Sequence, residues 1–128
     1  MLLENKKILI MGIRNKWSIA YGIAKSAYKN GAKLIFTYMN EENKNKIEEL
    51  ISEFKGSKAY VLNGASEDEL VRETFNKIKE ENGKIDGLVH AIAHANTEDL
   101  HNDFINTGKE GYSHAIDVSA YSFVLAAR

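Results

Sequence analysis

The chain has 128 residues, which is enough for one compact domain and too few for two. Acidic and basic residues nearly balance, 18 against 17, so no strong field would attract nucleic acid or an anionic membrane surface. The absence of cysteine excludes disulfides and cysteine-based metal or redox sites, and it fits a cytoplasmic location. The N-terminal residues lack the apolar core of a secretory signal, and no apolar run approaches the ~20 residues of a membrane helix.

The chain begins with a strand, a glycine-containing turn and a helix. Residues 7–11 are a short apolar run ending at Gly12, which predicts a buried strand. In residues 18–30 apolar side chains recur at helical spacing, with Ser18 as N-cap and Gly31 as the stop.

The alternation continues along the chain. Residues 33–38 predict a second strand and residues 41–54 a charged helix with one apolar stripe, ended by Gly56. A third strand is expected at 58–62 and a third helix at 67–81.

A fourth strand is expected at 86–93, followed by a long polar segment at 96–108 and a last helix from about residue 109. Helical crossovers imply parallel pairing, so the prediction is α/β: a Rossmann-like, doubly wound parallel sheet of about four strands with helices on both faces. Residues 1–128 are expected to form a single, partial dinucleotide-binding domain. The segment 96–108 is too long for a simple connection and is typical of a lid or a binding loop.

The turn from Gly12 to Gly22 joins the first strand to the first helix, where a doubly wound fold holds a dinucleotide pyrophosphate. Gly12 would let the chain turn tightly beside the ligand, and Gly22 would let helix and sheet approach closely. The turn lacks the middle glycine of the usual dinucleotide motif, so the alternative is that both are plain turn and packing glycines and Ser18 only a cap. Arg14 and Lys16 would attract the pyrophosphate or would be exposed loop charges.

Four segments taken together resemble one family. They are Gly12 with Ser18-Ile19-Ala20-Tyr21-Gly22-Ile23-Ala24 after five residues, Phe36-Thr37-Tyr38, His90-Ala91-Ile92-Ala93, and Ser119-Ala120-Tyr121-Ser122-Phe123. In this order they are similar to the enoyl-acyl-carrier-protein reductases, a divergent branch of the short-chain dehydrogenase/reductase family. Because the matches are spread over the whole chain, the set is more specific than a glycine motif alone.

The resemblance implies reduction of the enoyl double bond of an acyl-carrier-protein-linked substrate in fatty acid biosynthesis, with hydride from NADH. A homo-oligomer is also expected, because without the family's later strands the fourth strand would be an open edge that favours pairing with another copy. Ala93, His94 and Ala95 would lie near the nicotinamide and the acyl site. The residues carried over as lining the pyrophosphate, the ribose and the rest of the cofactor are Gly12, Ile13, Ser18, Ile19, Ala91 and Ile92.

Two positions bear on the adenosine end of the cofactor. Met39 stands after the second strand, where many dinucleotide folds place an acid for the ribose, so the preference for NADH rests on the resemblance. After the third strand the family has an aspartate that contacts the adenine, and here Gly64 takes its place. The missing carboxylate predicts weaker adenine binding, with the backbone of Ala65 as the remaining contact.

The family's catalytic tyrosine, with a lysine seven residues later, has no counterpart in this sequence. We therefore expect an N-terminal part of such a reductase, truncated before the catalytic pair and inactive alone. One alternative is a folded, self-associating half-domain without a tight ligand. The other is an independent flavodoxin-like nucleotide-binding module.

Four histidines and a set of acids complete the candidates. His90 and His94 fall at a strand end and in a loop, not four apart on a helix, so no metal site is expected. His90 is expected to be a packed strand residue. The acids Glu98, Asp99, Asp103 and Glu110 are expected to be solvated loop charges.

Overall fold

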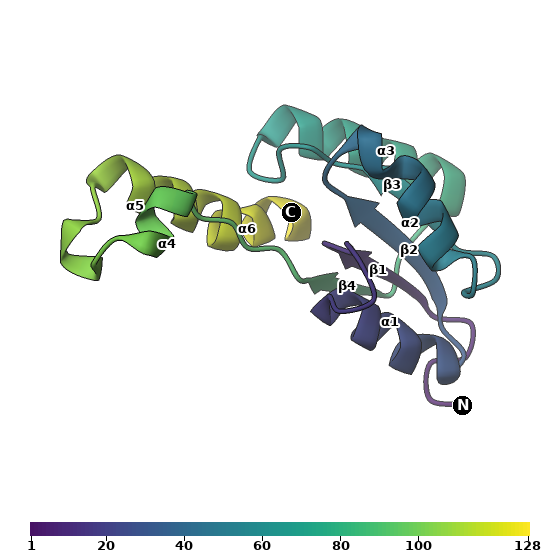
Figure 1. Cartoon of the computed structure of the whole chain (residues 1–128). Coiled ribbons are helices and arrows are strands. Elements are labelled where there is room, and N and C mark those ends of the chain that lie inside the picture. The colour runs from purple at the N-terminus through teal and green to yellow at the C-terminus, as the bar shows by residue number, and fades with distance from the viewer.

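A four-stranded parallel sheet forms the centre of the computed structural model, which describes residues 1–128 (Figure 1). The strand order is β3-β2-β1-β4. The strands are β1 (Lys7–Met11), β2 (Lys33–Tyr38), β3 (Lys58–Val61) and β4 (Gly87–His90). The predicted α/β, Rossmann-like class is therefore confirmed.

Helices cover both faces of the sheet. One apolar cluster joins the sheet to α1 (Ile19–Lys29) and α2 (Lys44–Ile51), and a second joins its other face to α3 (Asp68–Asn82) and α6 (Ser122–Ala127). Successive strand residues point to opposite faces, so Ile10 belongs to the first cluster and Leu9 to the second. This two-sided burial explains why the strands are continuous apolar runs.

Three predicted segments differ from the observed elements by more than one residue at an end. The helix expected at 41–54 is a 3-10 turn at Glu41–Asn43 followed by α2, which ends at Ile51. Phe54 lies beyond the helix and still packs in the core, with its ring 5.4 Å from that of Tyr28. The fourth strand is shorter than predicted, and the polar segment 96–108 contains a helix, α4 (Thr97–His101), and a 3-10 turn, Phe104–Asn106.

The expected last helix is present but interrupted. It consists of α5 (Lys109–Ile116), a π-helical turn (Asp117–Tyr121) and α6. Residues 96–121, here called the arm, extend away from the sheet, and only α6 packs back against it (Figure 1).

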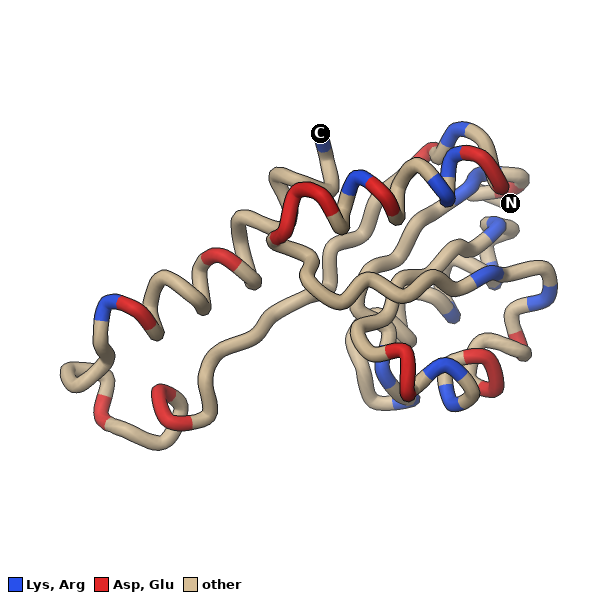
Figure 2. The backbone as a smooth tube through the Cα atoms, turned by 90° about the horizontal axis from the view of Figure 1, so that it is seen from above, with Lys and Arg blue, Asp and Glu red and all other residues tan.

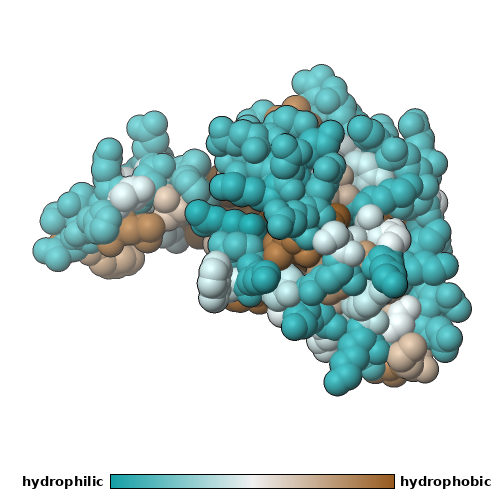
Figure 3. All heavy atoms as spheres, turned by 45° about the vertical axis from the view of Figure 1, so that its right-hand side comes forward, coloured by the Kyte–Doolittle hydropathy of each residue, from teal (hydrophilic) through white to brown (hydrophobic).

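The arm differs in surface chemistry from the rest of the molecule. Its acids are spaced along the tube in Figure 2, and Lys109 is its single basic residue apart from histidine. Apolar side chains nevertheless gather on part of its surface (Figure 3). Leu100, Phe104 and Ile105 are among the exposed apolar residues of the arm. None of the helices has the length and apolar character required to cross a membrane.

Candidate functional site

A cleft of 410 Å³ lies where the carboxyl ends of the strands meet the arm. Gly12 follows β1, Met39 follows β2, the segment 62–67 follows β3, and Ile92 and His94 follow β4. His114, Asp117 and Val118 of the arm close the other side. Ligands of open parallel sheets bind beyond the carboxyl ends of the strands, so this is the expected position for a site.

The backbone conformation at position 12, on the floor of this cleft, requires a glycine. Its φ of 96° lies in the left-handed region, and a Cβ there would collide with the carbonyl oxygen of Ala91. Its N–H donates to the carbonyl of Thr37 at 3.1 Å. The turn after β1 thus packs directly against the ends of both neighbouring strands, β2 and β4.

The predicted site residues divide into two groups. Gly12, Met39, Ala65 and Ile92 line the cleft. The other four surround the same turn without lining the cleft. Ile13 is buried in the core, Ser18 caps α1, Ile19 is 77% exposed, and Ala91 contacts Gly12.

The start of α1 follows one prediction and contradicts another. The Ser18 hydroxyl accepts a hydrogen bond from the N–H of Tyr21 at 3.3 Å, as expected of an N-cap. Gly22 is exposed, and a Cβ built on it meets nothing within 4 Å. The prediction that Gly22 brings helix and sheet together is wrong, because it faces solvent, whereas the neighbouring Ala20, Tyr21 and Ala24 are buried.

A carboxylate from another residue approaches position 64, which lacks one as predicted. Gly64 has a φ of 121°, which disfavours an aspartate there, but the Glu67 carboxylate lies 3.2 Å from where its Cβ would be. Glu67 also lines the cleft. The prediction missed Glu67 because it considered only position 64, which aligns with the family's aspartate, and Glu67 lies three residues further along the chain.

The loop after β4 is bonded to the arm. His90 is half-buried, and its Nε2 lies 2.7 Å from the Ser122 hydroxyl, which itself donates to the Val118 carbonyl. Because that hydroxyl has one proton, His90 Nε2–H is the donor to it. Burial lowers the pKa of His90, so it is a packed, neutral strand residue, as predicted.

Two contacts further along this loop were not predictable from the sequence. The Ser119 hydroxyl bonds both backbone groups of His94, and the imidazoles of His94 and His114 meet at 2.8 Å. Ser119 and His114 are 25 and 20 residues from His94 in the chain, so neither pairing follows from spacing.

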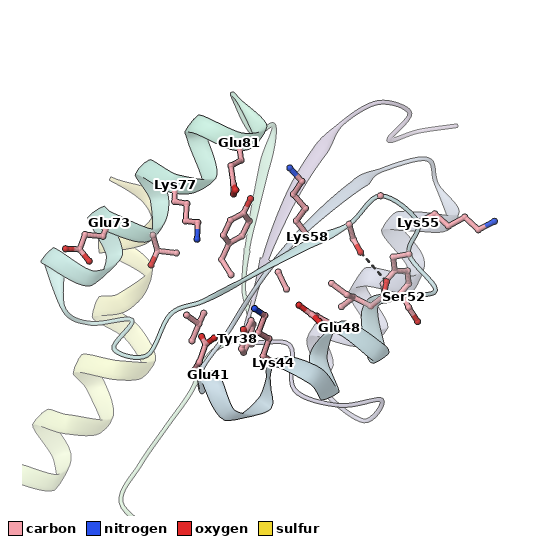
Figure 4. A pocket seen from close by; sticks show the side chains of 18 residues that line it. Tyr38, Glu41, Lys44, Glu48, Ser52, Lys55, Lys58, Glu73, Lys77 and Glu81 are labelled. Atoms are coloured by element: carbon pink, nitrogen blue, oxygen red, sulfur yellow. Dashed lines mark hydrogen bonds between the residues drawn. The ribbon is translucent and has the colours of Figure 1, made fainter.

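Two other features lie away from the cleft. A larger groove of 760 Å³ crosses the outer edge of β3 between α2 and α3, where lysines and glutamates alternate (Figure 4). The groove and the cleft share one lining residue, Tyr38. Burial raises the pKa of the Tyr38 phenol, and the negative charges of Glu41 and Glu48 raise it further. No group of three or more histidine or acidic side chains is placed to hold a metal ion.

Known proteins resemble the chain along its whole length. A family model described as enoyl-(acyl carrier protein) reductase matches residues 12–128. The NADPH-named enoyl-[acyl-carrier-protein] reductase of Staphylococcus aureus is 43% identical over 98% of this chain and 49% of its own length. The NADH-named enzyme of Bacillus cereus is 41% identical over 99% of this chain and 50% of its own length.

Solved structures agree with the sequence relatives. The crystal structure of the NADH-named enzyme of Aquifex aeolicus superimposes with a TM-score of 0.92 at 36% identity, covering 100% of this chain and 50% of that one. The chain thus spans about half the length of the relatives it matches. The family match argues against the flavodoxin-like alternative. The chain belongs to the enoyl-(acyl carrier protein) reductase family.

Proposed function

We propose that this chain is the cofactor-binding part of an enoyl-acyl-carrier-protein reductase and that it binds NADH in the cleft without catalysing reduction by itself. The observation that carries the proposal is the packing of Gly12 against Ala91, which brings the turn after β1 beside the end of β4. The substrate of the whole enzyme would be an enoyl group linked to acyl carrier protein.

The residues present fit a dinucleotide. Met39, Ala65 and Ile92 give the cleft apolar surface for the adenosine, and Glu67 offers an acceptor for the adenine amino group. The amide of Ile19, the first of α1, lacks an intrahelical acceptor and lies at the end of the helix that favours an anion, so Ile19 would hold the pyrophosphate. Ser18 would join it only by giving up the bonds that its amide and hydroxyl donate to the Asn15 carbonyl. Arg14 is exposed in the same turn and adds a positive charge.

The chemistry of the reaction would come from the cofactor, whose nicotinamide supplies the hydride. The chain's own contribution would be to orient the dinucleotide. Ile13 fixes the turn from within the core, and Ala91 supports Gly12 from below. A tyrosine–lysine pair of the family's spacing is not present in this sequence, so we assign no catalytic residue.

The test uses Trp17, the single tryptophan, which is 89% exposed in the turn before α1. NADH is titrated while Trp17 emission and its energy transfer to the reduced nicotinamide are recorded, and the titration is repeated with NADPH. Saturable quenching that is stronger with NADH is expected. A flat titration in a chain whose circular dichroism shows a folded α/β protein would refute the proposed binding.

Self-association is a second candidate property, favoured by the arm. Leu100, Phe104 and Ile105 are each at least 71% exposed, and β4 pairs with a strand on one side only. Exposed apolar surface and open sheet edges favour pairing with another copy. We propose a homo-oligomer, which sedimentation equilibrium would test: a mass of one chain, 14.4 kDa, at all concentrations would contradict it. The cytoplasmic location stays a prediction.

A further inference from the structure

One hydroxyl holds the loop after β4 by both of its polar backbone groups. The Ser119 oxygen accepts from the N–H of His94 at 3.0 Å and donates to the carbonyl of the same residue at 3.2 Å. Ser119 belongs to the π-helical turn of the arm. Such turns are rare and are often found at functional sites. The irregular turn therefore fixes the backbone of a residue that lines the cleft.

The side chain of the same residue makes a second link to the arm. His94 Nδ1 lies 2.8 Å from His114 Nε2, and the two rings are nearly perpendicular, at 86°. A hydrogen bond between two imidazole nitrogens needs one N–H and one bare nitrogen. The hydrogen bond can form when both rings are neutral or when one of them is protonated. It cannot form when both rings are protonated, because neither then has a bare nitrogen.

The charges around this pair come from three elements. Asp117, on the π-helical turn, and Glu67, before α3, line the same cleft as both histidines. On α4, the Asp99 carboxylate lies against Gly111, one turn before His114 on α5. The two imidazoles therefore lie among carboxylates, and no lysine or arginine lines the cleft.

We propose that Ser119 and His114 are positioning residues that hold the loop Ala91–Ala95 against the cleft through His94. The inference rests on the proposed function, because the loop is argued to support the cofactor. The backbone of Ala91 contacts Gly12, and Ile92 lines the cleft. A displacement at His94, two residues further on, would therefore disturb both.

The experiment measures NADH affinity by quenching of Trp17. At pH 7.5, Ser119→Ala and His114→Leu should each bind NADH about fivefold more weakly, the effect of losing roughly one hydrogen bond. His114→Gln, whose side-chain amide can still bond the His94 ring, should recover part of the affinity, which a loss of packing alone would not predict.

Two variants serve as matched controls. Ser113→Ala removes an exposed hydroxyl from α5 that makes no side-chain hydrogen bond, and His101→Gln removes an exposed histidine from α4. Both should bind NADH as the unaltered chain does. Thermal unfolding of each variant separates a loss of fold from a loss of positioning.

An NMR measurement of amide exchange reports the contact without the cofactor. The His94 N–H should exchange faster in Ser119→Ala. If the unaltered chain binds NADH while Ser119→Ala and His114→Leu bind it equally well, the positioning role is overturned and the proposed function stands. If the unaltered chain does not bind NADH, the proposed function fails, and the positioning role fails with it.

Discussion

Two glycines of the same turn should respond to alanine with opposite signs. At Gly12 the backbone has a φ of 96°, and a Cβ would collide with the Ala91 carbonyl. The left-handed conformation costs an alanine ~1–2 kcal/mol, and overpacking typically adds ~1–3 kcal/mol. Gly12→Ala should therefore lower the free energy of unfolding by ~2–5 kcal/mol, a large part of the ~5–15 kcal/mol of a typical domain.

Gly22 is the matched control. It lies on the exposed side of α1, and a Cβ there meets nothing within 4 Å. Replacing a glycine in a helix interior by alanine stabilises by ~0.5–1 kcal/mol, so Gly22→Ala should raise the free energy of unfolding.

Urea denaturation followed by circular dichroism measures both changes on one scale. NADH titration of the same variants should show binding lost in Gly12→Ala and kept in Gly22→Ala. The reasoning is refuted if Gly12→Ala costs less than about 1 kcal/mol, because the strain and the collision together exceed that value. If Gly22→Ala lowered the free energy of unfolding instead, position 22 would be in a packed contact and would not face solvent.

Three further changes test other contacts. Glu67→Gln should weaken NADH binding by about three- to tenfold in the Trp17 titration, because an amide is a poorer acceptor than a carboxylate for the adenine amino group. Ser18→Ala should lower the free energy of unfolding by ~1 kcal/mol in urea, the usual effect of losing an N-cap. Burial lowers the pKa of His90, so the unfolded chain takes up a proton first and stability should fall as the pH drops below 6.5. His90→Gln should flatten that fall in urea titrations at several pH values.

The sheet was predictable because its strands are buried on both faces. Each apolar run is short, ends near a glycine or a polar turn, and alternates with a helical pattern, which leaves parallel pairing as the consistent arrangement. β1 and β2 were predicted with the bounds they have, Lys7–Met11 and Lys33–Tyr38. The cap and stop of α1 followed from Ser18 and Gly31 for the same local reason.

Contacts that depend on tertiary structure were not predictable. Phe54 continues the apolar stripe of α2 and looks helical in sequence, but the helix ends at Ile51 and the ring reaches the core from a turn. Gly22 occupies a position that suggests close packing, and only the phase of the helix shows that it faces solvent. Half of the predicted site residues line the cleft: Gly12, Met39, Ala65 and Ile92 follow the carboxyl ends of strands, whereas Ser18 and Ile19 stand at the start of α1 and do not line it.

The choice between NADH and NADPH must come from this chain's own residues, because its relatives carry both names. The cleft is lined by two carboxylates, Glu67 and Asp117, and by no lysine or arginine. The extra phosphate of NADPH would bring about two negative charges to a site that already holds two, and no cation lining it would compensate them. We therefore expect NADH to bind more tightly than NADPH, and the difference to shrink at high salt, where exposed charges are screened. Tighter binding of NADPH at low salt would mean that cations outside the cleft reach the phosphate and outweigh these carboxylates.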